Sequence, residues 1–224
     1  QRQMCIRDSV YIQGYSVGAW LGYDFAGIDP KTGHTLAYAE DGTKVDMDMF
    51  NNRTLALKRP PMHYLGEGNP TTTGGFATEL RYKQWELNAQ FEFQTGHLIP
   101  TISSTMNHNY NYSGNRYIAD QYRWRAVGDV AERPYLGINN TAYDQYRFNT
   151  SLEKGDYLRC TYTSLGYRLT EELCKKLSVR SARIAITASN LFTLTNFKGI
   201  DPASMGTLSY PSTRTYSITL NVGF

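Results

Sequence analysis

Two carboxylates are the side chains of this sequence that come nearest to catalytic chemistry. Glu86 and Glu92 share one face of a predicted strand, and a carboxylate pair can act as acid and base in glycoside hydrolysis. The polar face of a sheet would carry the same residues without any catalysis. The sequence has neither the H-E-x-x-H pattern of zinc proteases nor a P-loop. We therefore expect no catalytic residue, no cofactor and no enzyme.

Histidine and cysteine spacing fits neither a metal site nor a disulfide framework. The three cysteines, Cys5, Cys160 and Cys174, form no C-x-x-C pair and are odd in number. No two histidines are two or four positions apart, as zinc ligands often are. We expect free thiols, buried or facing lipid, and no metal.

The best candidates for ligand contact are aromatic and arginine residues in a long loop. Tyr, Trp and Arg dominate the hot spots of protein interfaces, and flat rings beside planar donors also suit sugars and peptides. Trp124 could therefore contact a cargo, dock a partner protein, or anchor the core of its own loop. Single-stranded nucleic acid also binds aromatics with arginine, but a net charge of only +3 argues against it. The candidates are Tyr110, Tyr112, Tyr117, Tyr122, Arg123, Trp124 and Arg125.

The tetrapeptide Gly-Ile-Asp-Pro occurs twice, at 27–30 and at 199–202. Asp-Pro favours a turn, and each copy follows a predicted strand. We expect both copies to begin long loops. A ligand role for Asp29 and Asp201, for example toward calcium, is the alternative.

Alternating apolar and polar residues predict the strands that must position these side chains. In the clearest strand, 85–94, Trp85 and every second residue after it are apolar. A tight turn at Lys83–Gln84 would join this strand to the preceding one, in a register that sets Arg81 opposite Glu86. The predicted strands are 17–25, 76–82, 85–94, 157–169, 182–188 and 216–224.

Two features interrupt the strand pattern in the second half of the chain. The apolar frame of 157–169 changes, which predicts a β-bulge near Tyr162 to Ser164. Residues 170–177 carry glutamates early and lysines late, the charge order of a short helix.

The two faces of these strands differ in chemistry, which suggests lipid on one side and water or polar protein on the other. On the apolar face we expect lipid contact from Trp85, Leu87, Phe91, Phe93, Ile184, Ile186, Ile218 and Leu220. On the polar face we expect contact with a lumen from Arg81, Glu86, Asn88, Glu92 and Arg183. The final strand alternates through Tyr216, Ile218, Leu220, Val222 and Phe224.

Strand and loop lengths favour a membrane barrel. No run of about 18 apolar residues could form a membrane helix, but barrel strands alternate and escape that test. Strands of about ten residues suit a tilted membrane span, and the connections alternate between long and short. We predict an all-β fold, the C-terminal portion of a transmembrane antiparallel β-barrel with six long strands, long extracellular loops and short periplasmic turns. A soluble, secreted β-sandwich that binds carbohydrate and a passive porin are the alternatives.

Residues 1–9, QRQMCIRDS, differ in pattern from the rest and resemble a translated sequencing adapter. We expect them to be foreign. Residues 10–224 then carry the whole of the strand pattern.

Several stretches resemble, in order, the barrel of the SusC/RagA-type TonB-dependent outer-membrane transporters of Bacteroidetes. The most specific are YLR followed by LGY within 157–169, SNLFTLT followed by GIDP within 189–202, and the closing RTYSITLNVGF. The resemblance covers nearly all of 15–224, and Cys160 departs from it, since an aliphatic residue is more usual there.

This resemblance implies a function and a set of partners. It implies import of oligosaccharides, glycan fragments or peptides through a plugged barrel in the cell outer membrane. Residues 10–224 would be the C-terminal part of that barrel, with the plug and the N-terminal strands missing from this chain. The polar-face residues would then face the lumen or the plug. The implied partners are a SusD-like surface lipoprotein, TonB and outer-membrane lipid. The alternating last strand resembles the signal that the barrel assembly machinery recognises.

Overall fold

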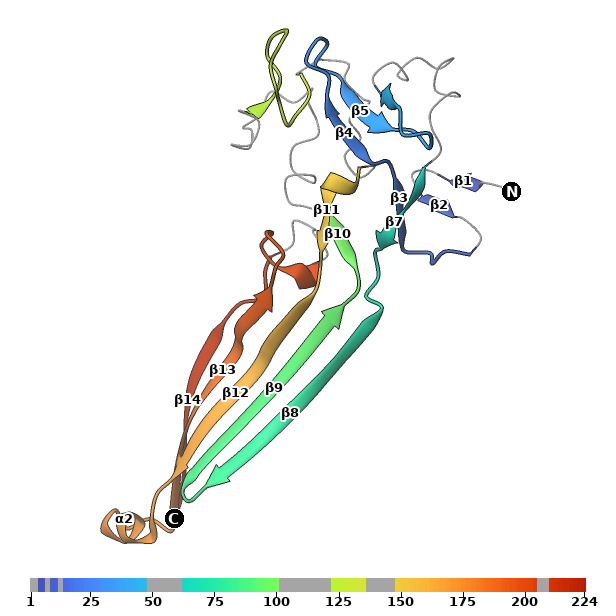
Figure 1. Ribbon diagram of the computed structural model, residues 1–224. Helices are drawn as coiled ribbons and strands as arrows, with labels where there is room; N and C mark the ends of the chain where they lie inside the picture. Colours follow the sequence, from blue (N-terminus) through green and yellow to red (C-terminus); the bar gives the residue numbers. More distant parts are fainter. Residues whose placement is uncertain are drawn as a thin grey trace.

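Five long antiparallel strands form the main sheet of the computed structural model, in the order β14-β13-β12-β9-β8 (Figure 1). Their bounds are Thr72–Tyr82 for β8, Trp85–Thr95 for β9, Tyr157–Arg168 for β12, Ser181–Thr195 for β13 and Thr215–Gly223 for β14. The structure describes residues 4–6, 9–11, 14–47, 62–100, 122–135, 148–204 and 210–224.

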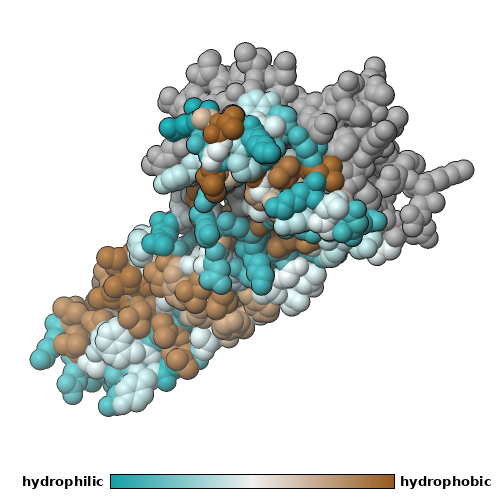
Figure 2. Space-filling view, turned by 45° about the horizontal axis from the view of Figure 1, so that its top comes forward, coloured by the Kyte–Doolittle hydropathy of each residue, from teal (hydrophilic) through white to brown (hydrophobic). Residues whose placement is uncertain are grey.

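The strand register aligns the apolar residues of all five strands in rows on one face of the sheet. One row is Leu80, Leu87, Leu165, Ile186 and Ile218, and the next is Tyr82, Trp85, Tyr167, Ile184 and Leu220. Phe76, Phe91, Cys160 and Phe192 form a third row. The eight residues expected on the apolar face therefore all lie on it. Many stay exposed, up to 78% for Ile218, and Figure 2 shows apolar residues gathered on the elongated part of the molecule.

Short and long connections alternate at the two ends of this sheet, as predicted. Lys83 and Gln84 alone join β8 to β9, with Lys83 in the left-handed region at φ 53°. The helix α2, Glu171–Lys176, lies in the short link from β12 to β13, close to the C-terminus (Figure 1). The long connections β9–β12 and β13–β14 leave and rejoin the sheet at its opposite end (Figure 1).

The predicted bulge is confirmed in β12, slightly earlier than expected. The register shifts between Cys160 and Tyr162 against both neighbouring strands. Thr161 is the extra residue, and its hydroxyl donates to the carbonyl of Gln90 at 3.2 Å. Tyr162 consequently lies opposite Gln90 and joins the polar face, not the apolar face of Cys160.

The prediction that residues 17–25 form the first strand of this sheet is wrong. Residues 17–25 divide into β3, Ala19–Gly22, and the start of β4, Phe25–Ile28. β3 pairs with β7, His63–Glu67, whereas β4 pairs with β5, Thr35–Tyr38, which pairs with β6, Lys44–Asp46. The apolar alternation here serves a small core, so the pattern alone does not reveal which sheet it joins.

This small core lies at the end of the molecule opposite α2, which we call the loop end because the long connections begin there (Figure 1). Tyr23, Ala37, Met47 and Phe148 are buried together, with Phe25, Val45 and Met62 packed against them. Two short strands, β10 at Leu98–Pro100 and β11 at Leu152–Lys154, pair with each other above β9 and β12. The remaining elements are the hairpin of β1, Met4–Ile6, and β2, Ser9–Tyr11, and two short 3-10 turns, η5 at Asn149–Ser151 and η6 at Pro202–Ser204.

Candidate functional site

A cluster of charges occupies the polar face of the sheet near the short turns. Glu86 accepts from Arg168 at 2.7 Å and from Arg183 at 3.1 Å, and its side chain is only 12% exposed. Arg81 lies opposite Glu86 in the register, as predicted, but its ion pair is with Glu79 at 2.5 Å. Glu86 therefore joins β9 to β12 and β13 across the sheet, while Arg81 stays on the exposed edge strand.

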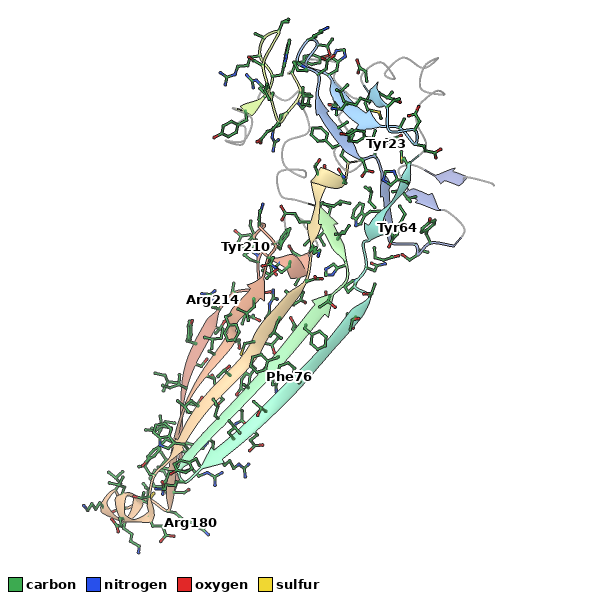
Figure 3. All side chains as sticks on the ribbon, viewed as in Figure 1. Tyr23, Tyr64, Phe76, Arg180, Tyr210 and Arg214 are labelled. Carbon is green, nitrogen blue, oxygen red and sulfur yellow. The ribbon has the colours of Figure 1, made fainter. Side chains whose placement is uncertain are left out.

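A cavity of about 560 Å³ opens beside this cluster, between α2 and the ends of β13 and β14. Arg168, Arg180 and Arg183 line it together with Glu171 and Asn221. Figure 3 shows Arg180 at this end of the molecule, close to α2. Two of these arginines, Arg168 and Arg183, are already paired with Glu86.

A second polar cluster lies on the same face toward the loop end. Arg159 on β12 lies opposite Glu92 in the register, and the two side chains are 3.8 Å apart. Arg159 also contacts Asp201 at 2.5 Å. Burial alone would raise the pKa of Asp201, but backbone donors from Ser212 and Ala203, with Arg159, hold that pKa below its usual value. Asp201 is thus satisfied by protein groups.

The loop candidates divide into described and undescribed residues. Tyr110, Tyr112 and Tyr117 lie outside the described part of the chain. Tyr122 is 59% exposed, whereas Trp124 is half-buried against the first Gly-Ile-Asp-Pro turn. The indole of Trp124 donates to the carbonyl of Pro30 at 2.9 Å, and its ring covers Gly33, where a Cβ would meet ring carbon at 2.5 Å. Of the three readings of Trp124, this geometry favours the loop anchor.

The first Gly-Ile-Asp-Pro copy forms a local turn. Asp29 accepts from the Lys31 amide and the Thr32 hydroxyl, each at 2.9 Å, and these bonds lower its pKa. The Asp29 amide donates to the carbonyl of His34 at 2.9 Å. Among the described residues, no group of three metal-binding side chains occurs at Asp29, Asp201 or elsewhere.

Sequence reasoning overlooked one match to a catalytic pattern. Gly14–Gly18 reads G-x-S-x-G, the nucleophile elbow of α/β hydrolases. An elbow needs a strand before the serine and a helix after it, but here β3 follows. Within the described part of the chain, the Ser16 hydroxyl contacts the carboxylate of Glu67 and no histidine. The match does not form a triad.

His97 is a second residue that sequence reasoning passed over. It is only 2% exposed at the junction of β9 and β10, and among the residues that the structure describes neither ring nitrogen has a hydrogen-bond partner. Burial lowers its pKa, against the opposing charge of Asp156. Its ring fills the space above Gly155, where a Cβ would meet Nε2 at 2.3 Å. A lone histidine after a glycine carries no sequence signal of burial.

Cys160 and Cys174 are free and buried, and the side chain of Cys5 lies outside the described part of the chain. Within the described ranges, no helix has the length and hydropathy to cross a membrane.

Comparison with known proteins gives relatives in sequence and in fold. No family model matches the chain. It is 24% identical over 234 residues to TonB-dependent receptor P3 of Formosa agariphila, covering 95% of this chain and 22% of the receptor. It is 25% identical over 184 residues to TonB-dependent receptor P26 of the same organism, covering 71% of this chain and 18% of that receptor. The chain thus spans about a fifth of the length of these curated relatives.

Solved structures of the RagAB peptide importer share the fold. In the open-open state the TM-score is 0.73 at 22% identity, over 100% of this chain and 24% of the importer chain. The closed-closed state gives the same TM-score and identity, over 99% of this chain and 25% of that one. The predicted resemblance to a SusC/RagA-type TonB-dependent transporter is thus confirmed, in sequence by the two receptors and in fold by RagAB.

Proposed function

We propose that this chain is part of the barrel wall of a SusC-like TonB-dependent transporter in the outer membrane of a Gram-negative, Bacteroidetes-like cell. The observation that carries the proposal is the two-sided sheet. One face presents continuous rows of apolar side chains, many of them exposed, and the other carries the linked charges of Glu86, Arg168 and Arg183. A soluble sandwich would bury the apolar face against a second sheet. The apolar rows would contact lipid, and the charged face would line a lumen.

The lumen contacts that we propose come from residues on the polar face. Glu86, Glu92 and Arg183 are already paired with neighbouring strands, so they would shape the wall more than bind cargo. Arg81 and Asn88 complete this set. Asn88 lies opposite Glu79 and Ser164 in the register.

The proposed cargo is an oligosaccharide, a glycan fragment or a peptide, and the name of the RagAB peptide importer supports the last of these. The proposed partners are a SusD-like surface lipoprotein and TonB, which would act through a part of the protein N-terminal to this chain. The exposed Tyr122, with Arg123 and Arg125, would contact cargo or lipoprotein, while Trp124 holds their loop in place. The barrel assembly machinery would recognise the strand from Tyr216 to Phe224.

Membrane fractionation and uptake together test this proposal. The full-length gene containing this sequence is expressed in its host, and membranes are washed with carbonate. We expect the protein in the outer-membrane pellet and uptake of labelled oligosaccharide or peptide that ceases when TonB is deleted. Protein in the wash would support the soluble carbohydrate-binding sandwich. Uptake that persists without TonB would support the passive porin.

A further inference from the structure

We propose that Arg159 and Asp201 form a latch that fixes residues 197–204 to the polar face of the sheet. The β13–β14 connection folds back beside the upper end of β12 (Figure 1). This inference rests on the proposed function: in a transporter barrel, the latch would make residues 197–204 a fixed wall of the transport path, not a moving lid. The two residues belong to separate motifs of the sequence, YLR and the second Gly-Ile-Asp-Pro.

The pair is buried and held by several hydrogen bonds. The two side chains are 6% and 7% exposed, and Arg159 Nη2 lies 2.5 Å from Asp201 Oδ1. Arg159 also donates to the hydroxyls of Thr193 at 3.1 Å and Ser212 at 2.9 Å. These bonds connect β12, β13 and both ends of the loop through a single guanidinium group.

Asp201 completes the latch from the loop side. Its carboxylate accepts from the backbone amides of Ala203 and Ser212, each at 3.0 Å. Removing one partner of a buried ion pair leaves an uncompensated charge, which costs far more than breaking an exposed pair. The carboxylate therefore ties Ala203 and Ser212, on the two sides of the loop, to one point on the wall.

Further contacts hold the same segment independently of the Arg159–Asp201 pair. Phe197 is only 7% exposed, and its ring lies over Gly199, where a Cβ would meet ring carbon at 2.1 Å. Pro202 is buried, and the Lys198 amide donates to Glu153 at 3.1 Å. Glycine at 199 thus allows the loop to close tightly enough for Asp201 to reach Arg159.

The first motif copy provides an internal comparison. Asp29 bonds only within its own turn and forms no ion pair with an arginine or lysine among the described residues. The same tetrapeptide therefore makes a local turn in one place and a long-range anchor in the other. What differs is the arginine opposite the second copy.

Trypsin cleavage after Lys198 in intact cells tests the latch, because cleavage requires local release of the segment. Asp201→Asn and Arg159→Gln are each expected to raise that rate at least about tenfold. The double variant should be no faster than the faster single variant, since both remove one interaction. Glu79→Gln, which breaks an exposed pair elsewhere, should leave the cleavage rate unchanged. Lys198→Gln removes the trypsin site, so the fragment missing from its digest is the one cut after Lys198. A wild-type rate in both single variants, or effects that multiply in the double variant, would overturn the latch.

Hydrogen exchange on the unmodified protein keeps the latch testable if the variants do not fold. The amides of Ala203 and Ser212 should exchange about as slowly as those of β13. Exchange as fast as at the exposed Val127–Val130 tip would contradict the latch. This measurement works in detergent and does not depend on transport.

Entry of a bulky dye that intact outer membranes exclude tests the wall. Cells carrying Asp201→Asn should admit the dye while the protein stays in the membrane. Faster cleavage without dye entry would refute the wall and leave the latch. Loss of the unmodified protein from the membrane pellet would instead refute the proposed function.

Discussion

Replacing Phe91 by arginine tests which face of the sheet meets lipid. Phe91 is the seventh of eleven residues in β9, so it lies near the middle of the strand. A strand of this length, tilted by roughly 45°, spans about 25 Å, the height of the apolar band of a membrane barrel. The ring of Phe91 stacks on Phe76 with centroids 4.8 Å apart and lies 6.4 Å from Phe192.

The expected cost combines two effects. Arginine at the bilayer midplane costs about 2–4 kcal/mol, and loss of the aromatic pair costs about 0.5–1.5 kcal/mol more. The matched control is Gln90→Arg, one residue away on the opposite face of the same strand, where Gln90 faces Ala77 and Tyr162. Arginine on the polar face should cost less than about 1 kcal/mol.

Heat-modifiable migration in gels, which separates folded from unfolded barrels, measures the outcome in outer membranes. We expect little folded protein for Phe91→Arg and a near-normal amount for Gln90→Arg. Equal folding of the two variants, or a greater loss with Gln90→Arg, would show that the apolar face does not contact lipid.

Three further perturbations probe the polar face, the junction of β9 and β10, and the loop that carries Trp124. Glu86→Gln removes the carboxylate that Arg168 and Arg183 share and should lower the free energy of unfolding by about 1–3 kcal/mol. The control Glu79→Gln, at an exposed pair, should change it by less than about 1 kcal/mol. Equal effects of the two variants in denaturant titrations would contradict the bridging role of Glu86. Because burial lowers the pKa of His97, the unfolded chain takes up its proton first, so stability should be full above the ordinary value of 6.5 and fall as pH drops through the folded pKa. His97→Gln should flatten that part of the profile, and a parallel loss of thermal stability in both proteins would exclude His97 as its source. Trp124→Ala removes the bond to Pro30 and should expose the loop at 122–135 to protease without reducing the folded barrel fraction, so unchanged digestion would refute the anchor role.

The sheet was predictable because its strands are long and two-sided. The alternation runs through 76–82 in β8 and through 85–94 in β9, so the hairpin register at Lys83–Gln84 follows from the pattern. β4 to β7 have only three to five residues each, too few for alternation to identify them. The prediction of 17–25 as one strand of the main sheet fails because the segment divides into two short strands. A divided strand and a continuous one have the same apolar spacing in the sequence.

Side-chain partners were less predictable than strands. The register fixes Arg81 opposite Glu86, but long flexible side chains reach diagonal and same-strand neighbours as easily as direct ones. Glu86 finds Arg168 and Arg183, which come from strands far away in sequence. The burial of His97 depends likewise on Gly155, which reaches it only through the fold.

The two Gly-Ile-Asp-Pro copies show how fold context gives identical residues different roles. Both aspartates accept a backbone amide two residues later, so the tetrapeptide specifies a turn wherever it occurs. Asp29 gains only the hydroxyl of Thr32, whereas Asp201 gains Arg159 from 42 positions earlier, placed by the register of β12. A Gly-Ile-Asp-Pro turn therefore becomes an anchor only where the wall beside it presents a buried cation. In related barrels, an arginine in the YLR position should accompany an aspartate in the second copy, and loss of one should accompany loss of the other.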